Sequence, residues 1–414
     1  MKVRIGLAVA FAALAVLAVG PTATLSDPGE NAVVHWSGVA QSAISAGRPP
    51  ASSTVLAGMV HGAMYDAVAG VQGGLEPFVT DVNAAAGASA DAAVATAARD
   101  VLVARVPGQA AAVQLAYDTY MAAIVAGAAR DNGIAAGAAA AAGMLAARAN
   151  DRFDDVVPYV QPTPGPGVFE PIAATPVVDT KLGRVQPFTY NSQSEYRPGP
   201  PIDLTSKRYA LDLAEVQSIG RAGVNPLRSD FQTETARFFQ DQTYVQYSRG
   251  VRGIANSQGL DLRESARLLA YVWVSAADTM IACWEAKFVY YFWRPNHAIA
   301  RADTDGNRYT EPEAGWSPLI TGNHPEYPSG HGCITSAVAE SLFRYFGTKH
   351  VELMLTSTTT GTARTYGKLD ELYDDVENAR VWGGLHFRTT MTDTFKHFPR
   401  IAKDVGKQHF LERD

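Results

Sequence analysis

Apolar residues recur at helical spacing along most of the chain, which predicts a mainly α-helical protein. Residues 262–292 are apolar on most sides, so we expect a long helix at the centre of the fold. In residues 334–346 the apolar side chains stand three or four positions apart, which predicts a helix that begins close to Ser329. Residues 31–70 predict two further helices, and helices resume at Tyr209.

Alanine dominates residues 81–152, and this stretch predicts three helices with breaks at Pro107-Gly108 and Asn132-Gly133. From residue 155 onward prolines are frequent and the helical periodicity is lost. We interpret this stretch as an ordered loop that wraps a helical core, with a flexible linker as the alternative. The predicted fold class is all-α, a large multi-helix bundle with long Pro-rich loops. The expected organisation is a helical scaffold at residues 31–154, the Pro-rich loop at 155–208, and a catalytic helical region at 209–414 packed on the scaffold.

The N-terminus has the pattern of an export signal. Charged residues among the first four precede an apolar run over residues 5–19, which is short for a membrane span. We expect a signal peptide at residues 1–23, with Ala23 as a candidate cleavage position, and a secreted or extracytoplasmic protein without an integral membrane domain once the signal is removed. An uncleaved anchor is the alternative.

Composition narrows the class of partner. The chain has 414 residues, 47% of them hydrophobic, which is ample for a large buried core. Its net charge of −6 and the lack of a basic stripe argue against nucleic acid as a partner. We expect Cys283 and Cys333 to be buried free thiols, although an oxidising compartment would also allow a disulfide between them.

The sequence Pro328-Ser329-Gly330-His331 marks a helix start that suits an anion. Ser329 is placed as the N-cap, and Gly330 and His331 fall in the first turn. A helix N-terminus offers unpaired N–H groups and the positive end of the helix dipole, while glycine lets an anion approach the backbone. An ordinary cap with a chance histidine is the plain alternative for this stretch alone.

Two other stretches add cations. Lys287 and Arg294 are seven residues apart, about two helical turns, so both are expected on one helix face, with Pro295 ending that helix. Arg380 and His386 are separated by Gly383-Gly384, which breaks the run and allows the two side chains to converge. Arginine forks and a lysine point charge match a tetrahedral oxyanion.

The order of these three stretches, K-x6-RP, PSGH and R-x5-H, resembles the superfamily that joins vanadium-dependent haloperoxidases to type 2 phosphatidic acid phosphatases and bacterial acid phosphatases. The resemblance to soluble bacterial haloperoxidases implies vanadate as a cofactor, in competition with phosphate, and hydrogen peroxide, halide and a small organic acceptor as partners. It implies that His386 bonds the vanadium of vanadate, that His331 is the acid/base, and that Lys287 is also catalytic. A homo-oligomer is left open. The residues implied to hold the oxyanion's other oxygens are Lys287, Arg294, Ser329, Gly330 and Arg380.

The same residues would also suit other functions. In a secreted acid phosphatase, His386 would attack phosphorus to give a phosphohistidine and His331 would protonate the leaving alkoxide. A non-catalytic oxyanion-binding protein is the third reading. The Trp293-Arg294-Pro295 context and the lead-in to Pro328 favour the haloperoxidase, which oxidises halide with hydrogen peroxide to a hypohalous species that halogenates organic acceptors.

One position departs from the family pattern. The family carries an aspartate four residues after the histidine, and here Thr390 stands in that place. A carboxylate there would orient His386 and raise its basicity, so its loss predicts lower affinity or rate. Asp393, seven residues after His386, is a candidate for partial compensation.

Overall fold

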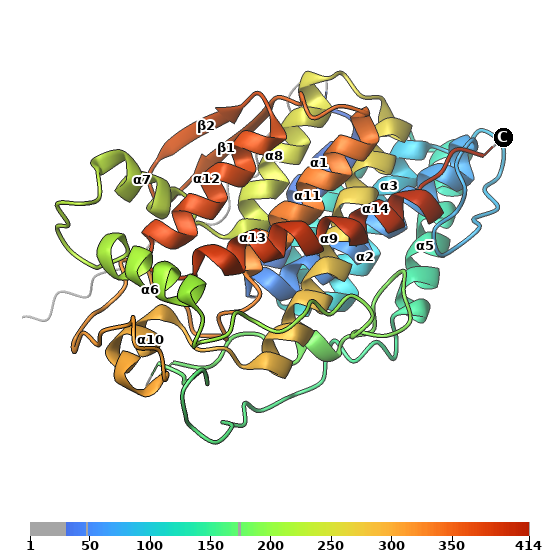
Figure 1. Cartoon of the computed structure of the whole chain (residues 1–414). Helices are drawn as coiled ribbons and strands as arrows, with labels where there is room; N and C mark the ends of the chain where they lie inside the picture. The colour runs from blue at the N-terminus through green and yellow to red at the C-terminus, as the bar shows by residue number, and fades with distance from the viewer. Residues whose placement is uncertain (1–29, 47–48, 173–174, 414) are drawn as a thin grey trace, which may run out of the picture.

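The computed structural model describes residues 30–413 apart from 47–48 and 173–174, and it confirms the all-α class. The signal peptide expected at residues 1–23 lies outside the described residues. In Figure 1, α6 (Lys207–Ile219) and α10 (Pro295–Ala300) lie at one end of the molecule, and α5 (Ala128–Ala147) lies at the other.

The N-terminal scaffold contains the two helices predicted within residues 31–70 and the three within the alanine-rich stretch. The break at Pro107-Gly108 is confirmed, but the break predicted at Asn132-Gly133 is wrong because α5 runs through it. Gly133 lets α5 approach the start of α3 (Ala90–Arg105) closely: a Cβ there would meet the Ser89 carbonyl oxygen at 2.3 Å. The remaining scaffold helices are α1 (Ala32–Ser45), α2 (Pro50–Gln72), α3 (Ala90–Arg105) and α4 (Ala110–Ala122).

The Pro-rich stretch between α5 and α6 is mostly irregular, with one short 3-10 turn at Leu182–Arg184. It is attached to the core by hydrogen bonds with the side chains of Asp278 and Asn323. The Asp278 carboxylate accepts from the backbone N–H groups of Phe188 and Thr189 at 2.6 and 3.0 Å. The Asn323 side chain donates to the Thr175 carbonyl at 2.8 Å. These contacts support the expected loop wrapped against the helices over a free linker.

The long central helix is confirmed as α9 (Leu262–Tyr290), which starts with a capping box between Asp261 and Glu264. It packs against α2, α11 (Gly330–Phe346) and α14 (Pro399–Gln408) and is buried along most of its length. By length and composition α2 and α9 could each cross a membrane, yet 83% and 94% of their apolar windows are buried inside the protein. Such burial is typical of helices at the centre of a helical core.

The C-terminal half adds short helices around α9 and one feature that the sequence analysis did not predict, a two-stranded hairpin. Strands β1 (Leu353–Ser357) and β2 (Thr362–Tyr366) pair antiparallel, and β1 packs on α8. Besides α6, α9 and α10, the helices of this half are α7 (Asp230–Phe238), α8 (Thr243–Ser257), α11 (Gly330–Phe346), α12 (Leu369–Trp382), α13 (Arg388–His397) and α14 (Pro399–Gln408).

Candidate functional site

A cavity of about 290 Å³ lies where α11 begins and α12 ends. Five of the seven predicted site residues line it: Arg294, Gly330, His331, Arg380 and His386. The cavity wall also contains residues that were not predicted as site residues: Gln240, Ile320, Thr321, Gly322, His324 and Leu385. The predicted residues Lys287 and Ser329 are fully buried beside the cavity and do not line it.

The start of α11 is built as the sequence predicts. The Ser329 hydroxyl accepts from the Gly332 N–H at 3.3 Å, which makes Ser329 the N-cap. The Ser329 N–H donates to the Thr394 hydroxyl at 3.1 Å, so this bond ties the start of α11 to α13. Gly330 and His331, one and two positions further on, face the cavity.

Lys287 is placed differently from the prediction. Its ammonium donates to the carbonyl oxygens of Pro325 and Glu326 at 2.8 and 3.1 Å, and also to that of Pro328. A neutral amine has two N–H bonds, so three carbonyl acceptors require the charged form. Lys287 therefore fixes the loop that leads into α11 and places a positive charge next to this loop.

The expectation that Lys287 and Arg294 share one helix face is wrong. Tyr291 adopts a left-handed conformation (φ 48°, ψ 34°) and ends α9, and Phe292 then forms a bridge with Val168 of the Pro-rich stretch. Arg294 follows as the N-cap of α10, with Pro295 as its first residue. Proline thus starts a new helix here, after the preceding one has already ended.

Arg294 is the most heavily bonded cation of the cavity. Its guanidinium donates to the carbonyls of His324 and Leu385 at 2.8 and 2.9 Å. It also lies 2.9 Å from Nδ1 of His324 and 3.3 Å from Nε2 of His386. Arg294 therefore joins the 324–326 loop to the segment that carries His386.

The break between Arg380 and His386 is confirmed. Helix α12 ends at Trp382, and Gly384 has a positive φ of 74°. A Cβ at Gly384 would meet the Gly220 carbonyl oxygen at 2.6 Å, so glycine is required both by conformation and by space. This turn brings Arg380 and His386 to the same cavity.

The carboxylate beside His386 is that of Glu326, two residues before Pro328, which was not predicted as a site residue. Glu326 Oε1 accepts from His386 Nδ1 at 2.8 Å, and Oε2 accepts from the Thr390 hydroxyl at 2.9 Å. Because Nδ1 carries the proton, Nε2 of His386 has a lone pair on the cavity side. The carboxylate considered as a compensating group, Asp393, has no bond to His386 in the described structure.

Buried polar atoms in the cavity lack partners, and their chemistry fits an oxyanion. Among the described residues, neither His331 Nε2 nor Arg380 Nε has a hydrogen-bond partner. The Phe239 carbonyl is bonded by the His331 ring and by Arg380 Nη1, which leaves the unpaired nitrogens for a ligand. A guanidinium N–H can donate to an anionic oxygen, and an imidazole lone pair can accept from a protonated one. A tetrahedral oxyanion such as vanadate or phosphate supplies both kinds of oxygen.

The electrostatics of the cavity favour an anion. Burial lowers the pKa of Arg294 to about 10, and burial together with Arg294 lowers the pKa of Arg380 to about 9. Burial and these cations also lower the pKa values of His331 and His386 well below the usual range, so both imidazoles are neutral. Burial and the same two arginines lower the pKa of Lys287. An anion in the cavity would relieve the repulsion among the three cations.

The two cysteines form a disulfide, so the expectation of free thiols is wrong. Cys283 of α9 is bonded to Cys333 of α11, and both are fully buried. The earlier expectation rested on the general burial of free cysteine and missed that α9 and α11 pack side by side at this level. The bond lies four residues before Lys287 and two after His331, so it ties the helices that carry those two residues.

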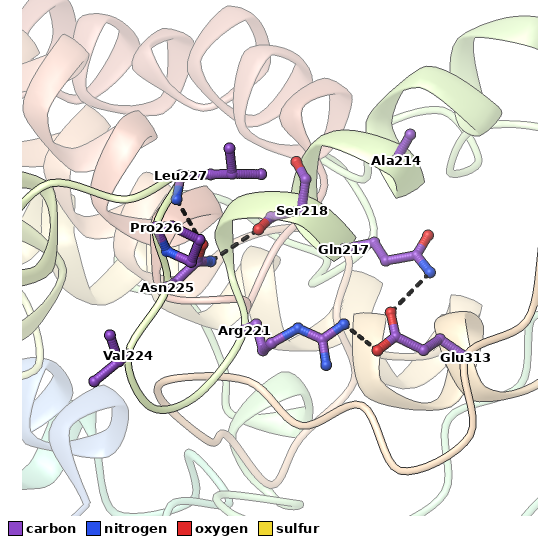
Figure 2. A pocket seen from close by; sticks show the side chains of 9 residues that line it. All are labelled: Ala214, Gln217, Ser218, Arg221, Val224, Asn225, Pro226, Leu227 and Glu313. Atoms are coloured by element: carbon purple, nitrogen blue, oxygen red, sulfur yellow. Dashed lines mark hydrogen bonds and ion pairs between the residues drawn. The ribbon is translucent and has the colours of Figure 1, made fainter.

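A second cavity, of about 350 Å³, lies between α6 and the loop that follows it, and its polar groups already satisfy one another. Figure 2 shows Arg221 paired with Glu313, which also accepts from Gln217 at 3.1 Å. Asn225 donates to the Ser218 carbonyl at 2.8 Å. We therefore assign the chemistry to the first cavity.

Comparison with known proteins agrees with this fold. Residues 267–410 match the family model of the VCPO second helical-bundle domain. None of the curated proteins matches the chain in sequence. Among solved structures, a bacterial vanadium-dependent iodoperoxidase superposes with a TM-score of 0.74 at 17% identity, covering 91% of this chain and 95% of the other.

Two further structures extend the likeness. A holo-type bacterial vanadium-dependent chloroperoxidase gives a TM-score of 0.69 at 17% identity, with 87% of this chain and 93% of the other covered. The apo-type chloroperoxidase gives 0.67 at 17% identity, with coverages of 86% and 93%. The chain thus has the fold of the bacterial vanadium haloperoxidases, and its residues 267–410 are similar to the VCPO second helical-bundle domain.

Proposed function

We propose that this protein is a vanadate-dependent haloperoxidase that uses hydrogen peroxide to oxidise halide and thereby halogenates a small organic acceptor. The observation that carries the proposal is that one cavity brings together two unpaired buried nitrogens and an imidazole lone pair. His331 Nε2 and Arg380 Nε are buried without partners in the described structure, and Nε2 of His386 is kept unprotonated by the bond from Nδ1 to Glu326. The fold and the second-domain match support the same reading.

Each residue would have a distinct task toward vanadate. His386 would bond vanadium through Nε2, because its other nitrogen is already committed to Glu326. Arg380 and Arg294 would neutralise charge on the oxygens, and the Gly330 N–H would add a backbone donor at the start of α11. Bound vanadate would supply Lewis-acid activation of hydrogen peroxide toward halide. His331, with a buried Nε2 and a neutral ring, would accept and return a proton at Nε2.

The position of Lys287 changes its proposed role. All three of its N–H bonds are directed to the carbonyls of residues 325–328, so it would act on the ligand through the loop and through its charge. A direct bond to the oxyanion would require it to give up one of these carbonyls. We further propose a secreted or extracytoplasmic location, which the Cys283–Cys333 disulfide supports because such bonds persist in oxidising compartments.

The decisive assay compares two activities. Protein incubated with orthovanadate, hydrogen peroxide and bromide should brominate phenol red, and His386→Ala should abolish this reaction. Release of p-nitrophenol from its phosphate without vanadate, lost in the same variant, would instead establish the phosphatase. Vanadate binding with neither activity would leave an oxyanion-binding protein. Either of the last two results would overturn the haloperoxidase proposal.

A further inference from the structure

The family pattern carries an aspartate four residues after the histidine that bonds the oxyanion, and this chain has Thr390 there. We propose that Glu326, from the loop before α11, replaces that aspartate as the residue that positions His386, with Thr390 orienting Glu326. The proposal rests on the oxyanion site proposed above, and it concerns residues of this chain alone.

The Glu326 carboxylate is fully buried and both of its oxygens are used. Oε1 accepts from His386 Nδ1 at 2.8 Å and from the Phe387 N–H at 3.1 Å. Oε2 accepts from the Thr390 hydroxyl at 2.9 Å. Burial raises the pKa of Glu326 to about 7, and the nearby Arg294 and Lys287 oppose that rise. Three donors around two oxygens, together with these cations, favour the ionised carboxylate and hold it in one orientation.

The backbone of Glu326 is fixed independently of its side chain. Its N–H donates to the Phe292 carbonyl at 2.8 Å, and its carbonyl accepts from Lys287 at 3.1 Å. The loop is thus attached to α9 and to the segment that follows α9. A carboxylate on so constrained a backbone can orient a ring, because its own position is determined by other contacts.

The bond to Glu326 determines which nitrogen of His386 faces the cavity as a lone pair. With Nδ1 donating to Oε1, Nε2 is the unprotonated nitrogen, and it lies 3.3 Å from the Arg294 guanidinium. A negative charge on the far side of the ring also increases the basicity of Nε2. Glu326 is therefore a positioning residue, and its effect on the oxyanion passes through His386.

Thr390 fits this arrangement where an aspartate would not. Its hydroxyl lies 2.9 Å from Glu326 Oε2, so a carboxylate at residue 390 would face a second buried carboxylate. Two such groups at close range repel each other unless one is protonated. A carboxylate at residue 326 thus goes with an uncharged side chain at residue 390, and a carboxylate at 390 should require an uncharged side chain at 326.

The experiment measures oxyanion affinity without peroxide or halide, so it is independent of any haloperoxidase activity. Dissociation constants for orthovanadate and for inorganic phosphate are measured by titration calorimetry on the full chain. We expect Glu326→Gln, which keeps the shape and removes the charge, to weaken the affinity for both anions at least about tenfold. Glu326→Ala should weaken it further, and adding Thr390→Asp to Glu326→Ala should restore most of the loss. Thr390→Asp alone should weaken binding.

Matched controls separate positioning from folding. Asp393→Asn removes the carboxylate of α13, which is not bonded to His386 in the described structure, and should leave both dissociation constants unchanged. Melting temperature identifies variants that fail to fold, and Glu326→Asp, a carboxylate with a shorter reach, should retain more affinity than Glu326→Gln. The ¹⁵N shifts of the His386 ring, assigned with His386→Ala, should show protonated Nδ1 in the wild type and a changed tautomer population in Glu326→Ala.

The outcomes either support or overturn the role proposed for Glu326. Rescue of Glu326→Ala by Thr390→Asp supports the exchange of the carboxylate between the two positions. Unchanged oxyanion affinity in folded Glu326→Gln and Glu326→Ala, or a folded double variant without rescue, overturns it. A wild type that binds oxyanion but does not brominate refutes the haloperoxidase proposal and leaves this test intact.

Discussion

Lys287 of α9 donates to the Pro328 carbonyl, directly before the Ser329 cap of α11. With its bonds to Pro325 and Glu326, the ammonium satisfies three carbonyls of one loop. Arg380, by contrast, keeps a buried Nε without a partner in the described part of the chain. One cation is thus committed to the protein and the other is available to a ligand.

This difference predicts opposite behaviour in two charge-removing variants. Lys287→Met removes a donor from three carbonyls, and of these only the Pro325 carbonyl keeps another among the described residues, from Arg294 at 3.5 Å. The ligand-free protein should therefore lose about 2 kcal/mol or more of unfolding free energy. Arg380→Met removes a buried charge with an unpaired N–H and should leave the ligand-free stability within about 1 kcal/mol of the wild type. Urea unfolding without oxyanion measures both.

The same pair is then compared with ligand present. Added orthovanadate should raise the melting temperature of the wild type and have little effect on Arg380→Met. An Arg380→Met protein stabilised as strongly as the wild type, or a Lys287→Met protein with unchanged ligand-free stability, would contradict these roles.

The disulfide between Cys283 and Cys333 should stabilise both the fold and the site. It closes a loop with a sequence separation of 50, for which the chain-entropy estimate is about 4 kcal/mol. The Cys283→Ala/Cys333→Ala variant should therefore lose about 2 to 4 kcal/mol. Its oxyanion affinity should also fall, because α9 and the start of α11 are no longer joined. Unfolding of the two proteins under non-reducing conditions tests this, and equal stabilities would refute it.

Acid should destabilise the fold through a buried histidine far from the cavity. Burial lowers the pKa of His61 to about 3, and its ring is bonded to Ala57 and Ser37. Between pH 6.5 and 3 the unfolded chain binds a proton that the folded chain does not, so stability falls as pH falls. From pH 7 to pH 5 the loss from His61 alone is about 2 kcal/mol.

The measurement is urea unfolding at both pH values for the wild type and for His61→Gln. The variant should lose about 2 kcal/mol less than the wild type on acidification. The exposed His350→Gln serves as the control and should behave as the wild type does. Identical pH dependence in His61→Gln and the wild type would show that His61 does not remain neutral in the folded protein.

Gly384 should be intolerant of a side chain. Its φ of 74° disfavours alanine, and the Gly220 carbonyl oxygen would lie 2.6 Å from the new Cβ. We expect Gly384→Ala to cost about 2 kcal/mol or more and to weaken oxyanion binding, because the turn that places His386 must move. Gly361→Ala is a matched control, since its φ is 70° and no atom lies near the added Cβ. Gly361→Ala should lose stability from the backbone strain alone and keep its oxyanion affinity.

Much of the fold follows from local patterns. Helical periodicity predicted α9 and α11, and the Ser329 cap was placed correctly because capping depends on residues three positions apart. The break predicted at Gly133 was wrong because the role of this glycine is not local. Glycine there serves close packing against α3, a contact between segments that no local pattern contains.

The candidate site was predictable as a set of residues, and less so as a set of contacts. Short-range motifs identified Arg294, His331, Arg380 and His386. They did not show that α9 ends at Tyr290, before Arg294, or that Lys287 is directed into a loop. Glu326 was missed because its partner lies 60 residues away, a relationship that only the folded chain displays.

Titration calorimetry with orthovanadate tests the central claim most directly, namely that the first cavity is an oxyanion site completed by His386 and Arg380. We expect one site per chain, competition by inorganic phosphate, and at least about a tenfold loss of affinity in His386→Ala and in Arg380→Met. Absence of binding to the folded wild type, or equal affinity in all three proteins, would contradict the account.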